Sequence, residues 1–479
     1  MKLPTTSAFY KILRTSFAHI PTEKQDTTLL RIAEFVLSKN TDTIFLLKGF
    51  AGTGKTTIIG TIVSNLWKTT LKAVLLAPTG RAAKVMSNYS KTDAFTIHRK
   101  IYFPKKEKGG GIKFVLAPNK HRNTLFIVDE ASMIPDAPSE SKLFGNGSLL
   151  DDLIMYVYSG FNCRLMLIGD TAQLPPVHLQ ISPALDEHKL SANYNKEVVF
   201  LELDEVVRQA ENSGILVNAT QLRTDLSAYV IPQFKFDVAP FKDIVRLVDG
   251  YEIQEAIENA YHQYSKEETV FIVRSNKRAN LYNESIRNKI LFLENELSPG
   301  DYMMVVKNNY FWLKPNSEAG FIANGDIIEI LEIYGLKELY GFKFAEVKIK
   351  MVDYPNQKPF ETVLLLDTIR ADSPSLPYAE SNRLYQEVLQ DYAHESSKYK
   401  KFLGVKNNKY FNALQVKFSY AITAHKSQGG QWETVFVEQP YLPNGIDKDY
   451  LRWLYTAITR AKTQLYLVGF KSDFFVGDE

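Results

Sequence analysis

The sequence is poor in cysteine, in long apolar runs and in net charge. Its 479 residues include one cysteine, which excludes an internal disulfide framework or a cysteine-built metal cluster and favours the reducing cytoplasm as its compartment. The apolar runs are soon interrupted by lysine, so we expect no membrane-spanning segment, and the basic N-terminus lacks the apolar core of a signal peptide. The net charge is only +3, from 57 basic and 54 acidic residues. A near-neutral chain can still bind nucleic acid through a local basic channel.

What the chain does contain is ordinary for a globular protein. Hydrophobic residues make up 45% and aromatic residues 12%, which excludes a disordered chain. At about 150 residues per domain, the length predicts roughly three domains.

Short apolar runs alternate with amphipathic helical stretches in two regions. In the first region they cover residues 43–47, 73–77, 125–128 and 164–168, and in the second 268–273, 416–421, 434–437 and 464–468. This alternation predicts βαβ units around buried parallel sheets. Between them, over about 299–408, alternating strands such as 325–332 and 342–351 predict a β-rich insert.

The predicted organisation is therefore α/β with two parallel-sheet domains. We expect the first domain over 1–204, with a small hairpin insert at about 100–122. The second covers 205–298 and 409–479, and the β-rich insert covers 299–408.

Residues 49–56, GFAGTGKT, match the pattern G-x-x-x-x-G-K-[ST]. They follow an apolar run and precede a helical stretch at 57–66, which is the context of a phosphate-binding loop. Glycines allow backbone N–H groups to point at phosphate oxygens, and the helix N-terminus adds a favourable dipole. The residues predicted to bind nucleotide are Gly49, Ala51, Gly52, Thr53, Gly54, Lys55, Thr56 and Thr57. Lys55 would reach the β- and γ-phosphates, and Thr56 would ligate Mg²⁺.

A second apolar run ends in two carboxylates, Asp129 and Glu130. Such an ending is common by itself, but beside a phosphate loop it predicts a site that hydrolyses ATP. Asp129 would hold Mg²⁺ through water, and Glu130 would orient and deprotonate the attacking water.

Six further motifs occur along the chain. They are APTGRAAK at 77–84, FTIH at 95–98, GDTAQLPPV at 169–177, EVVRQ at 205–209, YAITAHKSQG at 420–429 and YTAITRAK at 455–462. With these motifs the sequence resembles the superfamily I DNA helicases of the RecD/Dda-like branch, from about Gln25 to Lys462. Two stretches depart from the family pattern: the residues after Val177, where a glycine is expected, and the charged, irregular stretch 185–196.

The resemblance implies two RecA-like motor domains with ATP in the cleft between them. It assigns Gln25 to the adenine edge and Gln173 to sensing the γ-phosphate. Arg208 and Arg460 would reach across from the second domain to stabilise the charge that develops on the γ-phosphoryl group.

The resemblance also implies a groove for single-stranded DNA across both domains. The candidates are Thr79, Arg81, His98, Asn276, Thr423, His425 and Lys426. Hydroxyls, amides and cations hold phosphates without reading bases, which suits movement along any sequence. Alternatively, the two histidines are structural residues at the edge of the core, each hydrogen-bonded to a backbone carbonyl. The motifs identify neither a protein partner nor an oligomeric state, and a monomer is compatible with them.

Residues 101–116 read as a β-hairpin around a Lys/Gly turn, at the position of the family's duplex-splitting pin. The aromatic candidates for the pin are Tyr102, Phe103 and Phe114, with Phe103 preferred, and the basic ones are Lys105, Lys106 and Lys108. A solvated lysine-rich loop is an equally good interpretation.

Residues 321–330 resemble the first hairpin of the family's small Src-homology-type barrel. The basic, aromatic stretch 398–410 either closes over single strands or, as we slightly favour, is a solvated linker.

The predicted activity is thus ATP- and Mg²⁺-dependent translocation on single-stranded DNA, with unwinding at single-strand/duplex junctions and 5′→3′ polarity implied by the resemblance. The alternatives are a DNA-stimulated ATPase that remodels protein–DNA complexes and a nucleotide-dependent binding switch.

Overall fold

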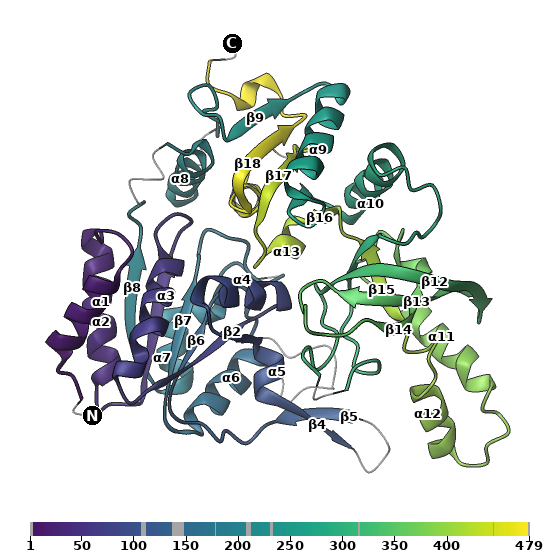
Figure 1. Cartoon of the computed structure of the whole chain (residues 1–479), viewed down its shortest axis with the longest axis horizontal. Helices are drawn as coiled ribbons and strands as arrows, with labels where there is room; N and C mark the ends of the chain where they lie inside the picture. Colours follow the sequence, from purple (N-terminus) through teal and green to yellow (C-terminus); the bar gives the residue numbers. More distant parts are fainter. Residues whose placement is uncertain are drawn as a thin grey trace.

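The computed structural model describes residues 3–106, 112–136, 148–177, 179–206, 212–229, 233–314, 317–443 and 445–477. Two α/β lobes and a β-barrel are visible in Figure 1, with the second lobe at the top and the barrel at the right. No helix in these ranges is long and apolar enough to cross a membrane.

The first lobe is built on a parallel sheet in the order β3-β2-β6-β7-β1-β8. Its strands are β1 (Thr43–Gly49), β2 (Lys72–Ala77), β3 (Ala94–Thr96), β6 (Arg122–Val128), β7 (Phe161–Gly169) and β8 (Glu197–Leu203). The central strands are buried on both faces, which explains why they read as continuous apolar runs.

Helices cover both faces of this sheet. They are α1 (Thr6–Ser16), α2 (Glu23–Leu37), α3 (Lys55–Asn65) and α4 (Gly80–Ser90) on one face, and α5 (Ile97–Ile101), α6 (Leu149–Tyr158) and α7 (Glu187–Tyr194) on the other. Three 3₁₀ turns complete the lobe: η1 (Leu66–Lys68), η2 (Ala131–Met133) and η3 (Pro183–Leu185). The irregular stretch expected at 185–196 is in fact largely α7, which Asp186 caps and Leu190 anchors in the core.

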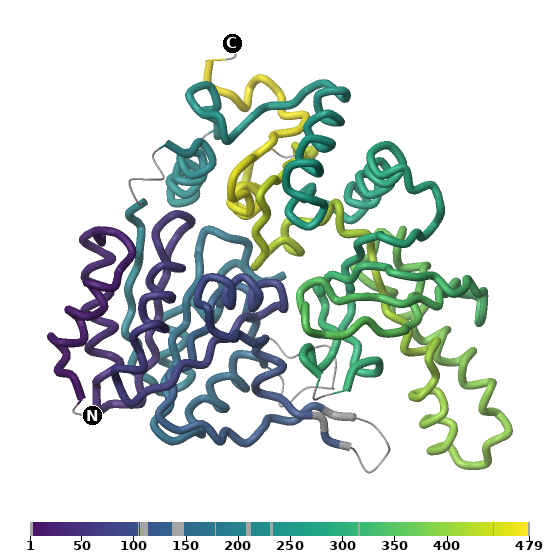
Figure 2. Tube along the Cα trace, viewed as in Figure 1, coloured from purple at the N-terminus to yellow at the C-terminus, as the bar shows by residue number. Residues whose placement is uncertain are grey.

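The second lobe has a parallel sheet in the order β16-β10-β17-β18-β9. Its strands are β9 (Ile244–Leu247), β10 (Thr269–Val273), β16 (Ala421–Thr423), β17 (Trp432–Glu438) and β18 (Ala461–Val468). Its helices are α8 (Gly214–Ser227), α9 (Gly250–Tyr264), α10 (Asn276–Ser285), α13 (Ala424–Ser427) and α14 (Lys448–Ile458), with η5 (Ile286–Ile290) and η7 (Ser472–Phe474). In the trace of Figure 2, teal and yellow segments lie side by side here, because the lobe is assembled from two distant parts of the chain.

The insert between those two parts contains a closed barrel. Its strands are β11 (Tyr302–Val305), β12 (Ile327–Leu339), β13 (Phe342–Met351), β14 (Phe360–Leu365) and β15 (Leu414–Phe418). Between β14 and β15 lie η6 (Leu366–Thr368), α11 (Tyr378–Gln390) and α12 (Lys398–Lys406). The predicted fold class is confirmed: two parallel-sheet lobes, a hairpin formed by β4 (Tyr102–Lys106) and β5 (Ile112–Leu116), and a barrel.

Two details of the expected organisation differ from the structure. The single strand expected at 416–421 is two strands: β15 pairs in the barrel and β16 pairs with β10 in the second lobe. The insert expected to end at 408 therefore continues through β15. The apolar run conceals this change of partner, because both strands are buried. The stretch expected to be a linker at 398–410 is helical over α12, whose Val405 packs in a core with α11.

Candidate active site

The phosphate loop joins β1 to α3 and is held by its own contacts. Gly52 and Gly54 have φ values of 75° and 88°, in the left-handed region that glycine allows. The Nζ of Lys55 donates to the carbonyls of Gly49, at 2.7 Å, and Phe50, at 2.8 Å. The buried Thr53 also donates to the Phe50 carbonyl. Since α3 begins at Lys55, the loop leads into a helix N-terminus that favours anions.

Gln25 supports this loop from helix α2. Its Oε1 accepts from the N–H of Thr22 as part of a capping box, and its Nε2 donates to the Thr53 carbonyl at 2.9 Å. The side chain is 3% exposed, and both ends of its amide bind protein atoms. The structure thus places Gln25 as a support of the phosphate loop, and reading an adenine edge would require it to release Thr53.

The predicted Mg²⁺ ligands have the right chemistry. Thr56 presents an exposed side chain at the start of α3. Asp129 follows β6, where its Oδ1 accepts from the Glu130 N–H at 2.9 Å and its Oδ2 from the Tyr89 hydroxyl at 2.8 Å. A hydroxyl and a carboxylate are oxygen ligands of the kind that Mg²⁺ prefers. The two donors from Glu130 and Tyr89 fix the orientation of the carboxylate, so these residues fit the ion. Thr57 is the third residue of the same helix.

Glu130 occupies a strained position at the end of the acidic motif. Its φ is 54°, which is unusual for a residue other than glycine and is found at functional sites. Burial raises the pKa of Glu130 above its ordinary value, while Arg460 and Lys55 act in the opposite direction. A raised carboxylate pKa is suited to a group that accepts a proton from water.

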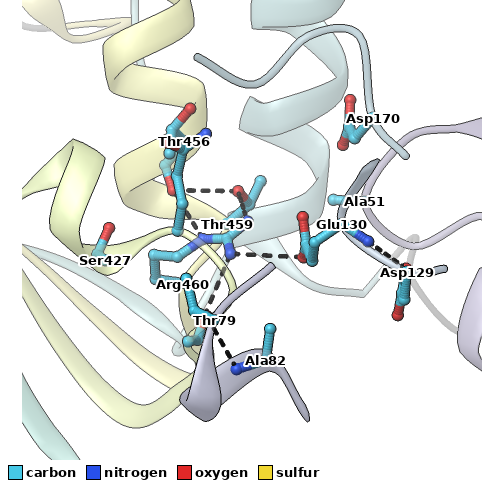
Figure 3. A network of polar contacts seen from close by, with 12 residues as sticks. Ala51, Thr79, Ala82, Asp129, Glu130, Asp170, Ser427, Thr456, Thr459 and Arg460 are labelled. Atoms are coloured by element: carbon cyan, nitrogen blue, oxygen red, sulfur yellow. Dashed lines mark hydrogen bonds and ion pairs between the residues drawn. The ribbon is translucent and has the colours of Figure 1, made fainter. Parts of the chain in front are cut away.

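Arg460 comes from the second lobe and approaches Glu130 across the cleft. Its Nη1 lies 4.0 Å from Glu130 Oε1, and the residue is 3% exposed. Its Nε donates to the Thr456 carbonyl at 3.0 Å, and Nη1 donates to the Gly430 carbonyl at 3.2 Å. Figure 3 shows the guanidinium between helix α14 and Glu130. Its predicted companion, Arg208, lies outside the described residues.

The loop that carries Gln173 is also tied to the second lobe. The N–H of Leu174 donates to Thr456 Oγ1 at 2.9 Å, and Gln428 Nε2 donates to the Leu174 carbonyl at 2.6 Å. Gln173 is 5% exposed, and its Oε1 has no hydrogen-bond partner among the described residues. It lines a cavity of about 390 Å³ between the lobes.

Sequence reasoning missed the tyrosine at the centre of this interface. Tyr455 Oη accepts from the Ala51 N–H of the phosphate loop at 2.8 Å and donates to Asp170 Oδ2 at 2.7 Å. Tyr455, Thr456 and Gln428 all lie in motifs that were recognised, but a motif does not show which of its members face the other lobe.

The first-lobe candidates for DNA lie at the ends of α4 and α5. Thr79 caps α4 by accepting from the Ala82 N–H. The Arg81 guanidinium lies 4.1 Å from the ring centre of Trp432 and donates to the Gln431 carbonyl, so it contacts the second lobe directly. Burial lowers the pKa of His98 to about 4, which makes it a neutral imidazole at pH 7 rather than a phosphate-binding cation.

The second-lobe candidates meet at the junction with the barrel. Asn276 begins α10 and donates to the Asp372 carbonyl, and Thr423 ends β16 just before α13. Lys426 on α13 donates to Asn324. One pocket is lined by three of the candidates, Asn276, Thr423 and Lys426, and by Asn280 and Lys417, which sequence reasoning did not select. His425 is exposed on the same helix.

Two of these groups are closely spaced cations. Burial lowers the pKa of Lys417 to about 8, and burial together with Lys417 lowers that of Lys426 to about 8. A nearby phosphate would raise the pKa of both lysines, because an opposite charge favours the charged form of a lysine.

The hairpin leaves one aromatic side chain exposed. Tyr102 is 8% exposed and donates to Asp152 at 2.6 Å, and Phe114 packs on Tyr310 with ring centres 4.3 Å apart. Phe103 is 40% exposed, and Lys105 is also exposed. The structure therefore favours Phe103 among the three aromatic candidates. Nothing is described for the side chain of Lys106, and Lys108 lies outside the described residues.

The geometry is that of a P-loop protein with its nucleotide site in a cleft between two α/β lobes. An arginine of the opposite lobe extends into this cleft. Comparison with family models agrees with this division. Residues 33–179 match an AAA domain, and residues 418–468 match the UvrD-like helicase C-terminal domain.

The chain is similar to two named helicases in sequence and, more distantly, to one solved structure. The chain is 24% identical to the ATP-dependent DNA helicase dda of Enterobacteria phage T4, over 88% of this chain and 93% of the phage protein. It is 34% identical over 135 residues to the ATP-dependent RecD2 DNA helicase of Deinococcus radiodurans, covering 28% of this chain and 16% of that protein. The Pif1 helicase from Bacteroides, solved in complex with ADP-AlF3 and ssDNA, aligns at 14% identity and a TM-score of 0.46, over 96% of this chain and 95% of the other.

The resemblance seen in the motifs is confirmed, because both family models and both named relatives point to superfamily I helicases of the RecD/Dda branch. The chain is accordingly an enzyme of the ATP-dependent helicase class.

Proposed function

We propose that this helicase binds and hydrolyses ATP with Mg²⁺ in the cleft between its lobes and uses the closing and reopening of the cleft to move along single-stranded DNA, 5′→3′, opening duplex at junctions. The observation that carries the proposal is the approach of Arg460 to Glu130 across the cleft. A residue of one lobe can complete the catalytic site of the other only when the lobes are closed, so hydrolysis and lobe movement are coupled.

The proposed roles in the cleft follow from position and chemistry. Gly49, Ala51, Gly52, Thr53, Gly54 and Thr57 belong to the loop that forms the cradle for the phosphates, in which the Ala51 N–H donates to Tyr455 Oη, and Lys55 supplies positive charge. Thr56 and Asp129 would hold Mg²⁺, which would neutralise phosphate charge. Glu130 accepts a proton from the attacking water, and Gln173 senses the γ-phosphate. Arg460, together with the predicted Arg208, stabilises the transition-state charge.

The proposed DNA groove lies on the barrel side of the lobes. Thr79 and Arg81 on the first lobe, and Asn276, Thr423, His425 and Lys426 on the second, supply hydroxyl, amide and cationic groups for phosphates. His98, being neutral, would act as a hydrogen-bonding group only. Lys417 joins the set because it shares a pocket with Lys426.

The hairpin would open the duplex by stacking Phe103 on the last base pair, with Lys105 near the backbone. Exposure of this ring, while Tyr102 and Phe114 pack inward, supports that choice. The 5′→3′ polarity rests on the family resemblance.

Two forked substrates test the proposal directly. A duplex with a 5′ single-stranded tail and one with a 3′ tail are incubated with the enzyme, ATP and Mg²⁺. Unwinding of the 5′-tailed substrate alone is the expected result, and unwinding of the 3′-tailed substrate alone would reverse the polarity. ATPase activity stimulated by single-stranded DNA without unwinding of either would favour the remodelling ATPase. Absence of stimulation would favour a binding switch.

A further inference from the structure

We propose that Tyr455 is a positioning residue that makes the catalytic placement of Arg460 depend on the phosphate loop. The inference rests on the proposed function, because it names the contact through which cleft closure and hydrolysis are coupled. Tyr455 contacts both lobes at the point where the nucleotide phosphates are expected.

A single hydroxyl joins three separate elements. Tyr455 on α14 accepts from the Ala51 N–H at 2.8 Å and donates to Asp170 Oδ2 at 2.7 Å. A phenolic hydroxyl has one donor and acceptor lone pairs, so both bonds form at once. The other oxygen of Asp170 accepts from the Ala172 N–H at 2.9 Å, next to Gln173. The hydroxyl therefore sets the phosphate loop and the Gln173 loop in one arrangement relative to α14.

The burial of these groups makes the hydroxyl indispensable to the closed arrangement. Tyr455 and Asp170 are each 1% exposed. If the hydroxyl is removed, a buried carboxylate oxygen loses its donor, which is costly away from water. In an open cleft the same carboxylate is hydrated and the cost disappears. Loss of the hydroxyl should therefore disfavour closure and leave nucleotide binding to the first lobe unchanged.

Helix geometry connects this contact to Arg460. Thr456 follows Tyr455 and binds the Leu174 N–H, and Arg460 is one helical turn further on, with its Nε bonded to the Thr456 carbonyl. A shift of α14 at Tyr455 moves the guanidinium away from Glu130. Tyr455 thus acts through Arg460 and touches no reacting atom itself.

The helix contains a matched control. Tyr450 is also on α14 and is 0% exposed, but its hydroxyl has no hydrogen-bond partner among the described residues. Tyr450→Phe and Tyr455→Phe remove the same atom from the same buried helix, and only the second change removes an interlobe contact.

The experiment measures ATPase rates of the full chain with saturating single-stranded DNA, and ADP affinity without DNA. Tyr455→Phe should lower kcat roughly 10- to 100-fold, as expected for losing hydrogen bonds that include a charged partner. Its ADP affinity and melting temperature should match those of Tyr450→Phe, whose kcat should equal the wild-type value. Equal kcat values for the two variants would overturn the inference, as would loss of ADP affinity in Tyr455→Phe.

A double variant tests whether Tyr455 acts through the arginine. If it does, Tyr455→Phe combined with Arg460→Lys should be no slower than Arg460→Lys alone, because residues that act as a unit are not additive. If the kcat losses of the two single variants multiply in the double variant, the positioning role is overturned. A wild-type enzyme whose ATPase ignores single-stranded DNA would refute the proposed function instead, so the two failures are distinguishable.

Discussion

The second lobe makes two very different interfaces, one with the barrel and one with the first lobe. With the barrel it shares a continuous apolar core, in which Phe271 and Phe436 of the lobe belong to the same cluster as Val347 and Leu364 of the barrel. With the first lobe its contacts are largely polar. They include the hydrogen bonds of Tyr455, Thr456 and Gln428, the approach of Arg460 to Glu130, the contact of Arg81 with Trp432, and an apolar contribution of Ala172 and Leu174.

The difference indicates which parts move together. Close-packed apolar cores resist separation, whereas hydrogen bonds between polar groups can be exchanged for water at little net cost. We therefore expect the barrel and the second lobe to rotate as one body against the first lobe. Substitutions at the polar interface should abolish ATP hydrolysis. Substitutions on the barrel side should weaken DNA binding or unwinding.

The largest effect is expected at the arginine of the polar interface. Arg460→Ala should lower DNA-stimulated kcat by about 10³–10⁵, because Arg460 is the one cation among the described residues of the second lobe that pairs with Glu130. The measurement is steady-state ATPase. The matched control is Lys462→Ala, an exposed cation two residues further on that pairs with Glu268 and Glu433. A small effect of Arg460→Ala would mean that the polar interface is not the catalytic one.

A slightly smaller effect is expected on the other side of the same interface. Glu130→Gln should lower kcat by about 10²–10⁴ and leave ATP binding intact, because the amide cannot accept the proton. Nucleotide titration and ATPase rate, measured side by side, check this expectation. Full turnover in this variant would remove the general-base assignment.

On the hairpin the effect should separate unwinding from hydrolysis. Phe103→Ala should reduce unwinding by roughly 5- to 100-fold, the range expected for losing one base–aromatic stack, with little change in ATPase rate. Phe292→Ala is the control, since Phe292 is an exposed phenylalanine on the second lobe. Equal losses of unwinding and ATPase activity would argue against a specific pin.

The smallest effect concerns pH at the barrel junction. Lys417 and Lys426, with pKa values of about 8, are charged below that pH and neutral above it. Affinity for single-stranded DNA should therefore fall a few-fold as pH rises through about 8, since each lost charge removes a phosphate contact. Fluorescence anisotropy at fixed salt measures this change. In Lys426→Gln the pH dependence should be shallower, and an unchanged profile would place the lysines outside the groove.

Local signals were sufficient to predict much of the fold and part of the cleft. The apolar runs before 49–56 and before Asp129 are β1 and β6, because strands buried on both faces leave a continuous apolar record in the sequence. The loop, the acidic pair and Arg460 could be found because their spacing within each motif is short. The division of 416–421 between two sheets could not be found, because apolar composition does not specify a pairing partner.

Long-range contacts account for what sequence reasoning missed. Nothing local shows that Tyr455 meets Ala51, that Arg81 lies on Trp432, or that Gln25 is held by Thr53. The same holds for the hairpin, where Tyr102 and Phe103 are neighbours in sequence but point to opposite faces of a strand. Which of them is exposed depends on Asp152, a residue of helix α6 that accepts a hydrogen bond from the Tyr102 hydroxyl.

The lone cysteine makes these motions accessible to spectroscopy. Cys163 lies in β7 and is 2% exposed, so maleimide dyes should label introduced thiols in preference to it. Trp67, Tyr251 and Tyr378 are exposed on the first lobe, the second lobe and helix α11 of the insert, so we expect each position to accept a cysteine. Energy transfer between dyes at 67 and 251 should change through the nucleotide cycle, whereas transfer between dyes at 251 and 378 should stay constant.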